Sequence, residues 1–197
     1  MIVSDTYRFV LISPPKTAST SLHRFLSQKP FRATKYKPSV ELNQHDTDIP
    51  ERCRDYHIVT CWRDPLDRNI SLWRHSQSAW ELKHGIPKLS FEEFIREYQE
   101  TSKRTFFREG QAYYYKRMPK WAKFTKIFQF TKLNLEIKKF QPIMQAWKDG
   151  YSLTELGRSN RTYHGTVEEH YTEELKKIVI ERFRDDYNFH LYLRTGK

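Results

Sequence analysis

Three short apolar runs have the composition of buried strands. The first, YRFVLIS at residues 7–13, is rich in strand-forming residues and stops at two prolines. The second, YHIVTCW at residues 56–62, leads into the polar turn RDPLDR, and the third, TKIFQF at residues 125–130, alternates apolar and polar positions. Runs of this length that end at turn residues are typical of strands rather than helices. We therefore predict three strands, the first two of them buried.

Helical patterns follow each run. Residues 90–100 predict a further helix, because Ser90 and Glu93 form a capping box ahead of an apolar face. Residues 172–187 predict the last helix. Strands that alternate with helices indicate an α/β fold, here with a central parallel sheet flanked by helices. The apolar positions at helical spacing are Leu22, Phe25 and Leu26 after the first run, Ile70, Leu72 and Trp73 after the second, and Leu133, Leu135, Ile137 and Phe140 after the third.

Length and composition exclude several classes of protein. A chain of 197 residues fits one domain over residues 1–197. Its 30% charged residues and mean hydropathy of −0.84 argue against a membrane span. The first eight residues lack the basic and apolar regions of a secretory signal, and two cysteines are too few for a disulfide scaffold or a four-ligand zinc site. We expect a cytoplasmic protein.

The chain is strongly basic, and most of its excess positive charge lies in one segment. Lys and Arg number 35 against 24 Asp and Glu, a net charge of +11. Residues 101–139 contain 11 basic residues and two acids, so this segment carries +9 of that charge. Such a segment attracts nucleic acid, phosphorylated or sulfated ligands, or acidic glycans. The alternative is a solvated basic face that binds nothing.

The junction after the first strand has the chemistry of an anion site. The sequence PPKTASTS at residues 14–21 places Lys16 and four hydroxyl side chains where a helix begins. A helix N-terminus carries partial positive charge and backbone donors, which suit a phosphate or sulfate. N-capping would explain one of the hydroxyls but not all four. The pattern G-x-x-x-x-G-K-S/T is absent, and the first glycine is Gly85, so we expect neither ATP hydrolysis nor a bound metal.

The junction after the second strand offers a second anion site. Arg63 ends the strand, and Ser71 follows eight residues later, about two turns into the predicted helix. The planar guanidinium of an arginine binds two phosphate oxygens at once. The alternative is that Arg63 pairs locally with Asp67 and that Ser71 is only a surface residue.

Together, the two junctions resemble the sulfotransferases that use 3′-phosphoadenosine 5′-phosphosulfate (PAPS). In that family, P-K-T/S-G/A-S/T-S/T-S cradles the 5′-phosphosulfate, and R-x-P-x-x-R-x-x-S-x-Y/W binds the 3′-phosphate. The C-terminal stretch HYTEELKKIVIERFRDDYNFHLY also resembles the closing helix of the carbohydrate-type members. The resemblance implies a P-loop-like nucleotide cleft. The second motif is matched in full by Arg63, Pro65, Arg68, Ser71 and Trp73.

The resemblance also implies a role for each matched residue. Lys16 would bridge the transferred sulfuryl group and its leaving phosphate oxygen. Arg63 and Ser71 would hold the 3′-phosphate, and Arg161, in a basic C-terminal loop, would contact the nucleotide. Ala18 stands where the family more often has glycine, a small change that we expect to be tolerated. The 5′-phosphate would be held by the loop residues Thr17, Ala18, Ser19, Thr20 and Ser21.

Sulfuryl transfer to a hydroxyl needs a base for the acceptor proton. We favour His45, because a loop histidine followed by a strand and R-x-P resembles the order in the cytosolic sulfotransferases. Asp46 or Asp48 would orient it. The alternative is a solvated loop histidine. His23, His75, His164 and His170 are the other candidates.

The sequence thus favours a PAPS-dependent sulfotransferase that releases 3′-phosphoadenosine 5′-phosphate (PAP). The acceptor hydroxyl would lie on a carbohydrate, and an acidic glycan bound by residues 101–139 would explain the excess positive charge. Tyr113, Tyr114, Tyr115 or Trp121 would then stack on sugar rings. The alternatives are a P-loop-like small-molecule kinase and a non-catalytic nucleic-acid-binding protein. The sequence indicates neither the identity of the acceptor nor the oligomeric state.

Overall fold

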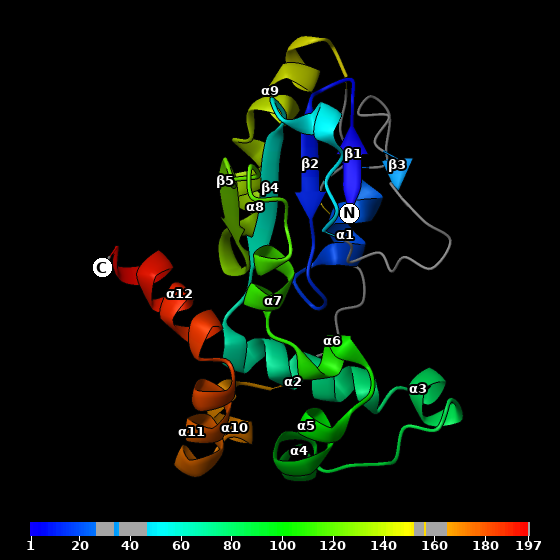
Figure 1. Ribbon diagram of the computed structural model, residues 1–197, viewed down its shortest axis with the longest axis vertical. Helices are drawn as coiled ribbons and strands as arrows, with labels where there is room; N and C mark the ends of the chain where they lie inside the picture. The colour runs from blue at the N-terminus through cyan, green and yellow to red at the C-terminus, as the bar shows by residue number, and fades with distance from the viewer. Residues whose placement is uncertain (27–33, 36–46, 152–155, 157–164, 197) are drawn as a thin grey trace. The chain divides into compact units, whose positions relative to one another are not determined.

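The structure is a computed structural model that describes residues 1–26, 34–35, 47–151, 156 and 165–196 (Figure 1). The chain divides into two compact units. The first, here called the sheet unit, consists of Met1–Trp62 and Tyr113–Asn160. The second, the helical unit, consists of Arg63–Ala112 and Arg161–Lys197. Each unit has its own hydrophobic core, and the single-domain organisation expected from the length stays a prediction.

The sheet unit contains a five-stranded sheet in the order β3-β1-β2-β4-β5 (Figure 1). The three predicted strands, β2, β4 and β5, are parallel neighbours, which confirms the α/β fold. The sheet is not wholly parallel, because β1 runs antiparallel to both β2 and β3. The sequence prediction missed β1 and β3, which are too short to show a strand period. The strands are β1 (Ile2–Ser4), β2 (Phe9–Ile12), β3 (Thr34–Lys35), β4 (His57–Trp62) and β5 (Lys126–Gln129).

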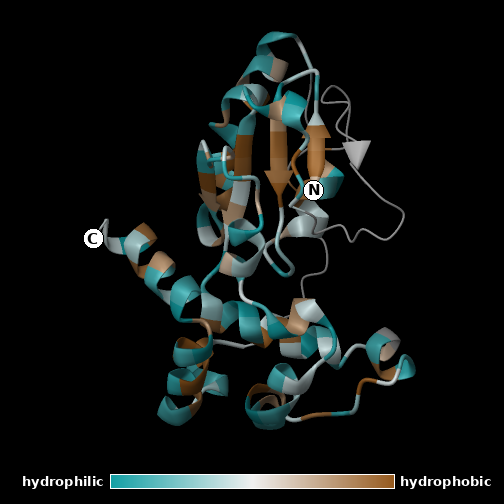
Figure 2. Ribbon diagram, viewed as in Figure 1, coloured by the Kyte–Doolittle hydropathy of each residue, from teal (hydrophilic) through white to brown (hydrophobic). Residues whose placement is uncertain are grey.

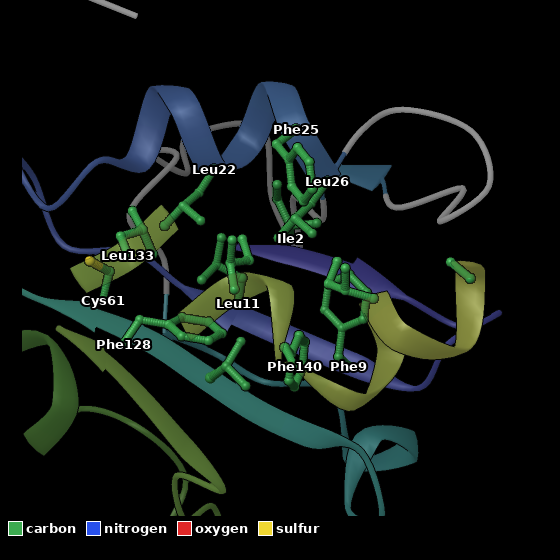
Figure 3. Close-up of a cluster of buried hydrophobic side chains, with 14 residues drawn as sticks. Ile2, Phe9, Leu11, Leu22, Phe25, Leu26, Cys61, Phe128, Leu133 and Phe140 are labelled. Carbon is green, nitrogen blue, oxygen red and sulfur yellow. The ribbon is translucent and has the colours of Figure 1, made fainter. Parts of the chain in front are cut away.

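Both faces of the sheet are covered, so its central strands are apolar on both sides (Figure 2). One face carries Phe9 and Leu11 and packs against helices α1 (Ser19–Leu26), α8 (Leu133–Lys138) and α9 (Gln141–Lys148). Figure 3 shows Leu22, Phe25 and Leu26 of α1 directed toward this face. The other face carries Val10 and Ile12 and is covered by residues 49–53 and 115–124.

Two predicted helices are each divided in the structure. The helix expected after β5 ends at Lys138, and Phe140 caps a separate α9 with proline in its first turn. Leu135, counted as an apolar-face residue, is 68% exposed and lies outside the core. The helix expected over residues 172–187 breaks at Phe183, whose φ of −113° and ψ of 42° are not helical. It becomes α11 (Glu173–Arg182) and α12 (Arg184–Thr195).

The helical unit packs helices around one apolar cluster that includes Ile70, Phe94 and Val179. The predicted capping box of Ser90 and Glu93 is present, and it begins a continuous helix made of α4, a π-helical turn η2 and α5. Within the described residues, no helix is long and apolar enough to cross a membrane. The elements not yet given are η1 (Glu51–Cys53), α2 (Pro65–Ser76), α3 (Ala79–Lys83), α4 (Phe91–Glu93), η2 (Phe94–Tyr98), α5 (Gln99–Thr101), α6 (Thr105–Arg108), α7 (Gln111–Lys116), η3 (Phe130–Lys132) and α10 (Val167–His170).

Candidate active site

The loop between β2 and α1 has an unusual backbone. Lys16 has a φ of +67° and Ala18 a φ of +64°, both in the left-handed region that favours glycine. Each such residue costs about 1–3 kcal/mol, and strain of this kind concentrates at functional sites. Left-handed residues that alternate with other conformations turn successive N–H groups toward a common centre and form an anion-binding nest. The φ of Ala18 also explains physically why glycine suits this position.

The loop is held from within the sheet unit by two buried hydrogen bonds. The Thr17 hydroxyl is fully buried and donates to the Pro14 carbonyl oxygen at 2.8 Å. Below the loop, the Ser13 hydroxyl and the His23 Nε2 lie 2.8 Å apart. The Thr17 side chain therefore braces the loop. His23, one of the alternative bases, ties the end of β2 to α1.

Helix α1 begins directly after this loop, at Ser19. Its first helical hydrogen bond runs from the Leu22 N–H to the Ala18 carbonyl at 2.9 Å, so the amides of residues 19–21 precede the helical bonding pattern. Thr20 is exposed, while Ser19 is only 7% exposed. Lys16, the two left-handed residues and the start of α1 thus follow one another in one segment of the sheet unit. That this segment binds an anion stays a prediction.

The second segment begins where β4 ends. Because β2 and β4 are parallel neighbours, the chain leaves both strands at the same edge of the sheet. In the helical unit, the Arg63 Nε donates to the Asp67 Oδ2 at 2.6 Å, and the Arg63 side chain is 7% exposed. The ion pair considered as the alternative is therefore present. Ser71 lies one turn beyond Asp67 and is 9% exposed, so it is a buried residue and not a surface one.

The start of α2 is fixed by Asp64. Its Oδ1 accepts from the Leu66 N–H at 2.8 Å and caps the helix, whose first residue is Pro65. Its Oδ2 lies 3.2 Å from the Nε2 of His190 on α12. Burial raises the pKa of Asp64, but His190 and the backbone donors outweigh it and hold that pKa below its usual value. The carboxylate therefore stays charged and keeps the cap in place.

Several predicted site residues lie outside the residues that the structure describes: His45, Asp46, Arg161 and His164. Their roles stay predictions. Lys16 and residues 17–21 belong to the sheet unit, and Arg63 and Ser71 belong to the helical unit. The sequence analysis missed Gln111, whose buried side chain bonds to the backbone of Arg63. A single internal glutamine carries no motif that would have marked it.

The aromatic residues of the basic segment pack against other parts of the protein. Tyr114 is 5% exposed, and the Tyr115 hydroxyl lies 3.0 Å from the Thr60 hydroxyl. Trp121 packs against the core below the sheet, and the Arg54 guanidinium lies 5.2 Å from its ring centroid. These three rings are engaged within the protein and do not form open stacking platforms. Tyr113 is half-buried and packs edge-on against Tyr114, and the guanidinium of the exposed Arg117 lies 5.3 Å from its ring centroid.

The basic charge belongs mainly to the sheet unit. That unit contains 19 Lys and Arg against nine Asp and Glu, a net +10, whereas the helical unit has 16 against 15, a net +1. Arg104 and Arg108, on the helical-unit side of the segment, pair with Glu81 and Glu109. The cations of the sheet-unit side are all exposed: Lys116, Arg117, Lys120, Lys123, Lys126, Lys132, Lys138 and Lys139. The exposed cations of the sheet-unit side of the basic segment therefore lie within residues 116–139.

The family model of the sulfotransferases, described as "Sulfotransferase family", matches residues 1–192. The chain belongs to the sulfotransferase family, which comprises PAPS-dependent enzymes. It is therefore a sulfotransferase that uses PAPS as donor and a hydroxyl group as acceptor. Comparison with the curated proteins gives no match. Membership favours this activity over the kinase and nucleic-acid-binding alternatives. No group of three or more His, Cys, Asp or Glu side chains in the described part of the chain could hold a metal ion.

Proposed function

We propose that the loop of residues 16–21 binds the 5′-phosphosulfate of PAPS and that Arg63 and Ser71 bind its 3′-phosphate. The observation that carries this proposal is the left-handed backbone at Lys16 and Ala18, directly before the start of α1. A strained loop with this geometry suits a tetrahedral anion. The Arg63 guanidinium, held at Nε by Asp67, suits a second one.

PAPS, when bound, supplies an activated sulfuryl group whose leaving group is a phosphate. In the proposed mechanism, Lys16 places its ammonium beside the oxygen on which negative charge develops. The amides of residues 19–21 hold the neighbouring phosphate oxygens in a fixed orientation. Donors that are already in place cost no reorganisation during the reaction. His45 takes the proton from the acceptor hydroxyl.

Nucleotide affinity tests the two-anion arrangement. PAP should bind about 10- to 100-fold more tightly than adenosine 5′-phosphosulfate (APS), which lacks the 3′-phosphate, because a hydrogen bond to a charged group contributes about 1.5–3 kcal/mol. Arg63→Ala should remove most of this difference. Titration calorimetry with both nucleotides measures it.

A second arginine of α2 provides the control for this experiment. Arg74 is exposed and lies 4.5 Å from the Trp73 ring centroid, so Arg74→Ala removes a cation from the same helix. It should leave the ratio of PAP to APS affinity unchanged. Equal affinity of the wild-type protein for the two nucleotides would refute the assignment of Arg63 and Ser71.

We further propose that the acceptor is an acidic carbohydrate and that it binds the exposed cations of residues 116–139. The nucleotide contacts involve none of these residues, so the excess charge is available for a second anionic substrate. Arg117, which lies over the Tyr113 ring, presents its exposed charge to a charged sugar. The cytoplasmic location stays a prediction.

Charge reversal tests the acceptor proposal. The triple variant Lys116→Glu, Arg117→Glu, Lys120→Glu should raise the acceptor KM about tenfold, since exposed charge pairs contribute about 0.2–1 kcal/mol each. PAP affinity should not change. In the wild-type protein, the acceptor KM should rise between about 50 and 200 mM salt, because screening acts over roughly 10 Å at 0.1 M.

A matched triple variant in the helical unit separates local attraction from net charge. Lys83→Glu, Lys88→Glu, Lys177→Glu makes the same change in charge at exposed positions. It should leave the acceptor KM nearly unchanged. If the two triple variants behave alike, or if a neutral acceptor is used equally well at both salt concentrations, the basic segment is not an acceptor site.

A further inference from the structure

The backbone of Arg63 is held on both sides by one side chain. Gln111 is fully buried, its Oε1 accepts from the Arg63 N–H at 3.0 Å, and its Nε2 donates to the Arg63 carbonyl at 2.8 Å. These two bonds fix the peptide groups before and after the Arg63 Cα. They therefore fix the direction in which the arginine side chain leaves the backbone.

Gln111 is itself held by a buried carboxylate from the C-terminal helix. Asp186, in the first turn of α12, is 2% exposed and accepts from the Gln111 N–H at 2.6 Å and the Ala112 N–H at 2.7 Å. A Cβ on Gly110 would lie 2.8 Å from each of its carboxylate oxygens, so any larger residue there would displace the carboxylate. Burial raises the pKa of Asp186, and the nearby Arg68 opposes that rise.

Arg68, on α2, holds the segment that precedes Gln111. It is 1% exposed and donates from Nη2 to the Glu109 carbonyl at 3.1 Å. The segment of residues 109–111, at the start of α7, is thus held by α2 through Arg68 and by α12 through Asp186. All of these residues belong to the helical unit. Burying this many polar groups around one short segment costs free energy unless each of them is hydrogen-bonded. The network therefore suggests that the position of this segment matters for function.

We propose that Gln111, supported by Asp186, is a positioning residue that pre-orients Arg63 for the 3′-phosphate. Asp67 holds the guanidinium at Nε, and Gln111 holds the backbone, so the arginine is fixed at both ends of its side chain. Its conformational freedom is then lost during folding and not during nucleotide binding, which increases affinity. This inference rests on the proposed role of Arg63.

The test compares two buried glutamines of the helical unit. Gln111→Met keeps the length of the side chain and removes both bonds to Arg63. It should weaken PAP binding about five- to tenfold and leave APS binding unchanged, because APS has no 3′-phosphate. Gln99→Met is the matched control. Gln99 is also fully buried, but its amide donates to Asn69 on α2 and not to Arg63.

Thermal unfolding of both variants shows whether they lose similar stability, while calorimetry gives the ratio of PAP to APS affinity. A lowered ratio in Gln111→Met but not in Gln99→Met supports the positioning role. An unchanged ratio in Gln111→Met, or an equal loss for both nucleotides, overturns it. If Gln111→Met does not fold, Asp186→Asn replaces it, because it keeps the size of the side chain and loses one acceptor. The same outcomes then apply.

Arg63→Ala distinguishes failure of this inference from failure of the proposed function. If Arg63→Ala leaves the affinity ratio unchanged, Arg63 does not bind the 3′-phosphate, and both proposals fall. If Arg63→Ala lowers the ratio and Gln111→Met does not, the nucleotide assignment holds and only the positioning role is wrong.

Discussion

Lys16→Ala should lower turnover about 10²- to 10³-fold, the usual effect of removing one pre-oriented group that stabilises developing charge. PAP affinity should fall by less than tenfold, because the charge of Lys16 matters most in the transition state. The substitution keeps a Cβ at a φ of +67°, so the backbone strain of the loop is nearly unchanged. The loss therefore reports the ammonium group. Steady-state kinetics and PAP titration measure the two effects.

Three variants make the experiment specific. Lys16→Gly relieves the strain and also removes the charge, so it should lose about as much turnover as Lys16→Ala. Lys16→Arg keeps the charge and should retain more activity than either. Arg24→Ala removes an exposed cation from the last turn of α1 and should have little effect. If Lys16→Ala lowers PAP affinity and turnover equally, Lys16 contributes only to binding.

His45→Ala should lower turnover about 10²- to 10⁴-fold, the typical contribution of a general base. PAP affinity should stay nearly intact, because the base acts on the acceptor. This prediction comes from the order of the loop histidine, the following strand and the R-x-P motif. Single-turnover measurements with saturating donor separate the chemical step from nucleotide binding.

The described histidines provide the controls for His45. His23 is 5% exposed and bonded to Ser13, so His23→Ala should mainly reduce stability. The His75 Nε2 lies 3.2 Å from the carboxylate of Glu81, and its side chain is 37% exposed. His75→Ala should leave turnover within a few-fold of the wild type. Full activity in His45→Ala together with a large loss in His75→Ala would move the base to His75.

The candidate site shows what local sequence can and cannot predict. The residues after β2 and β4 carry the local signals on which the two predicted anion sites depend: prolines, hydroxyl residues and arginine at strand ends. The sequence left undecided whether Arg63 pairs with Asp67, because an arginine four residues from an aspartate can form a local ion pair or bind a ligand instead. Gln111 and Asp186 could not be found, since their partners lie 48 and 75 residues away.

The strained loop after β2 is only partly predictable from the sequence. Ala18 stands where the family motif more often has glycine, the residue for which a left-handed φ carries no steric penalty. The left-handed φ of Lys16 has no such signal, because lysine has no preference for it. On either side of Lys16, the buried Thr17 hydroxyl bonds to the Pro14 carbonyl and α1 packs against the sheet.

The sequence by itself determined the parallel strands β2, β4 and β5, the capped helix that begins at Phe91, the sulfotransferase motifs after β2 and β4, and the excess of positive charge. These features depend on short-range periodicity, turn residues and composition. Only the tertiary structure decided the pairing of β1 and β3, the break at Phe183, the packing of Tyr114, Tyr115 and Trp121, and the buried network around Arg63. Each of these is stabilised by partners distant in the chain, so no local window of the sequence contains the interactions that fix it.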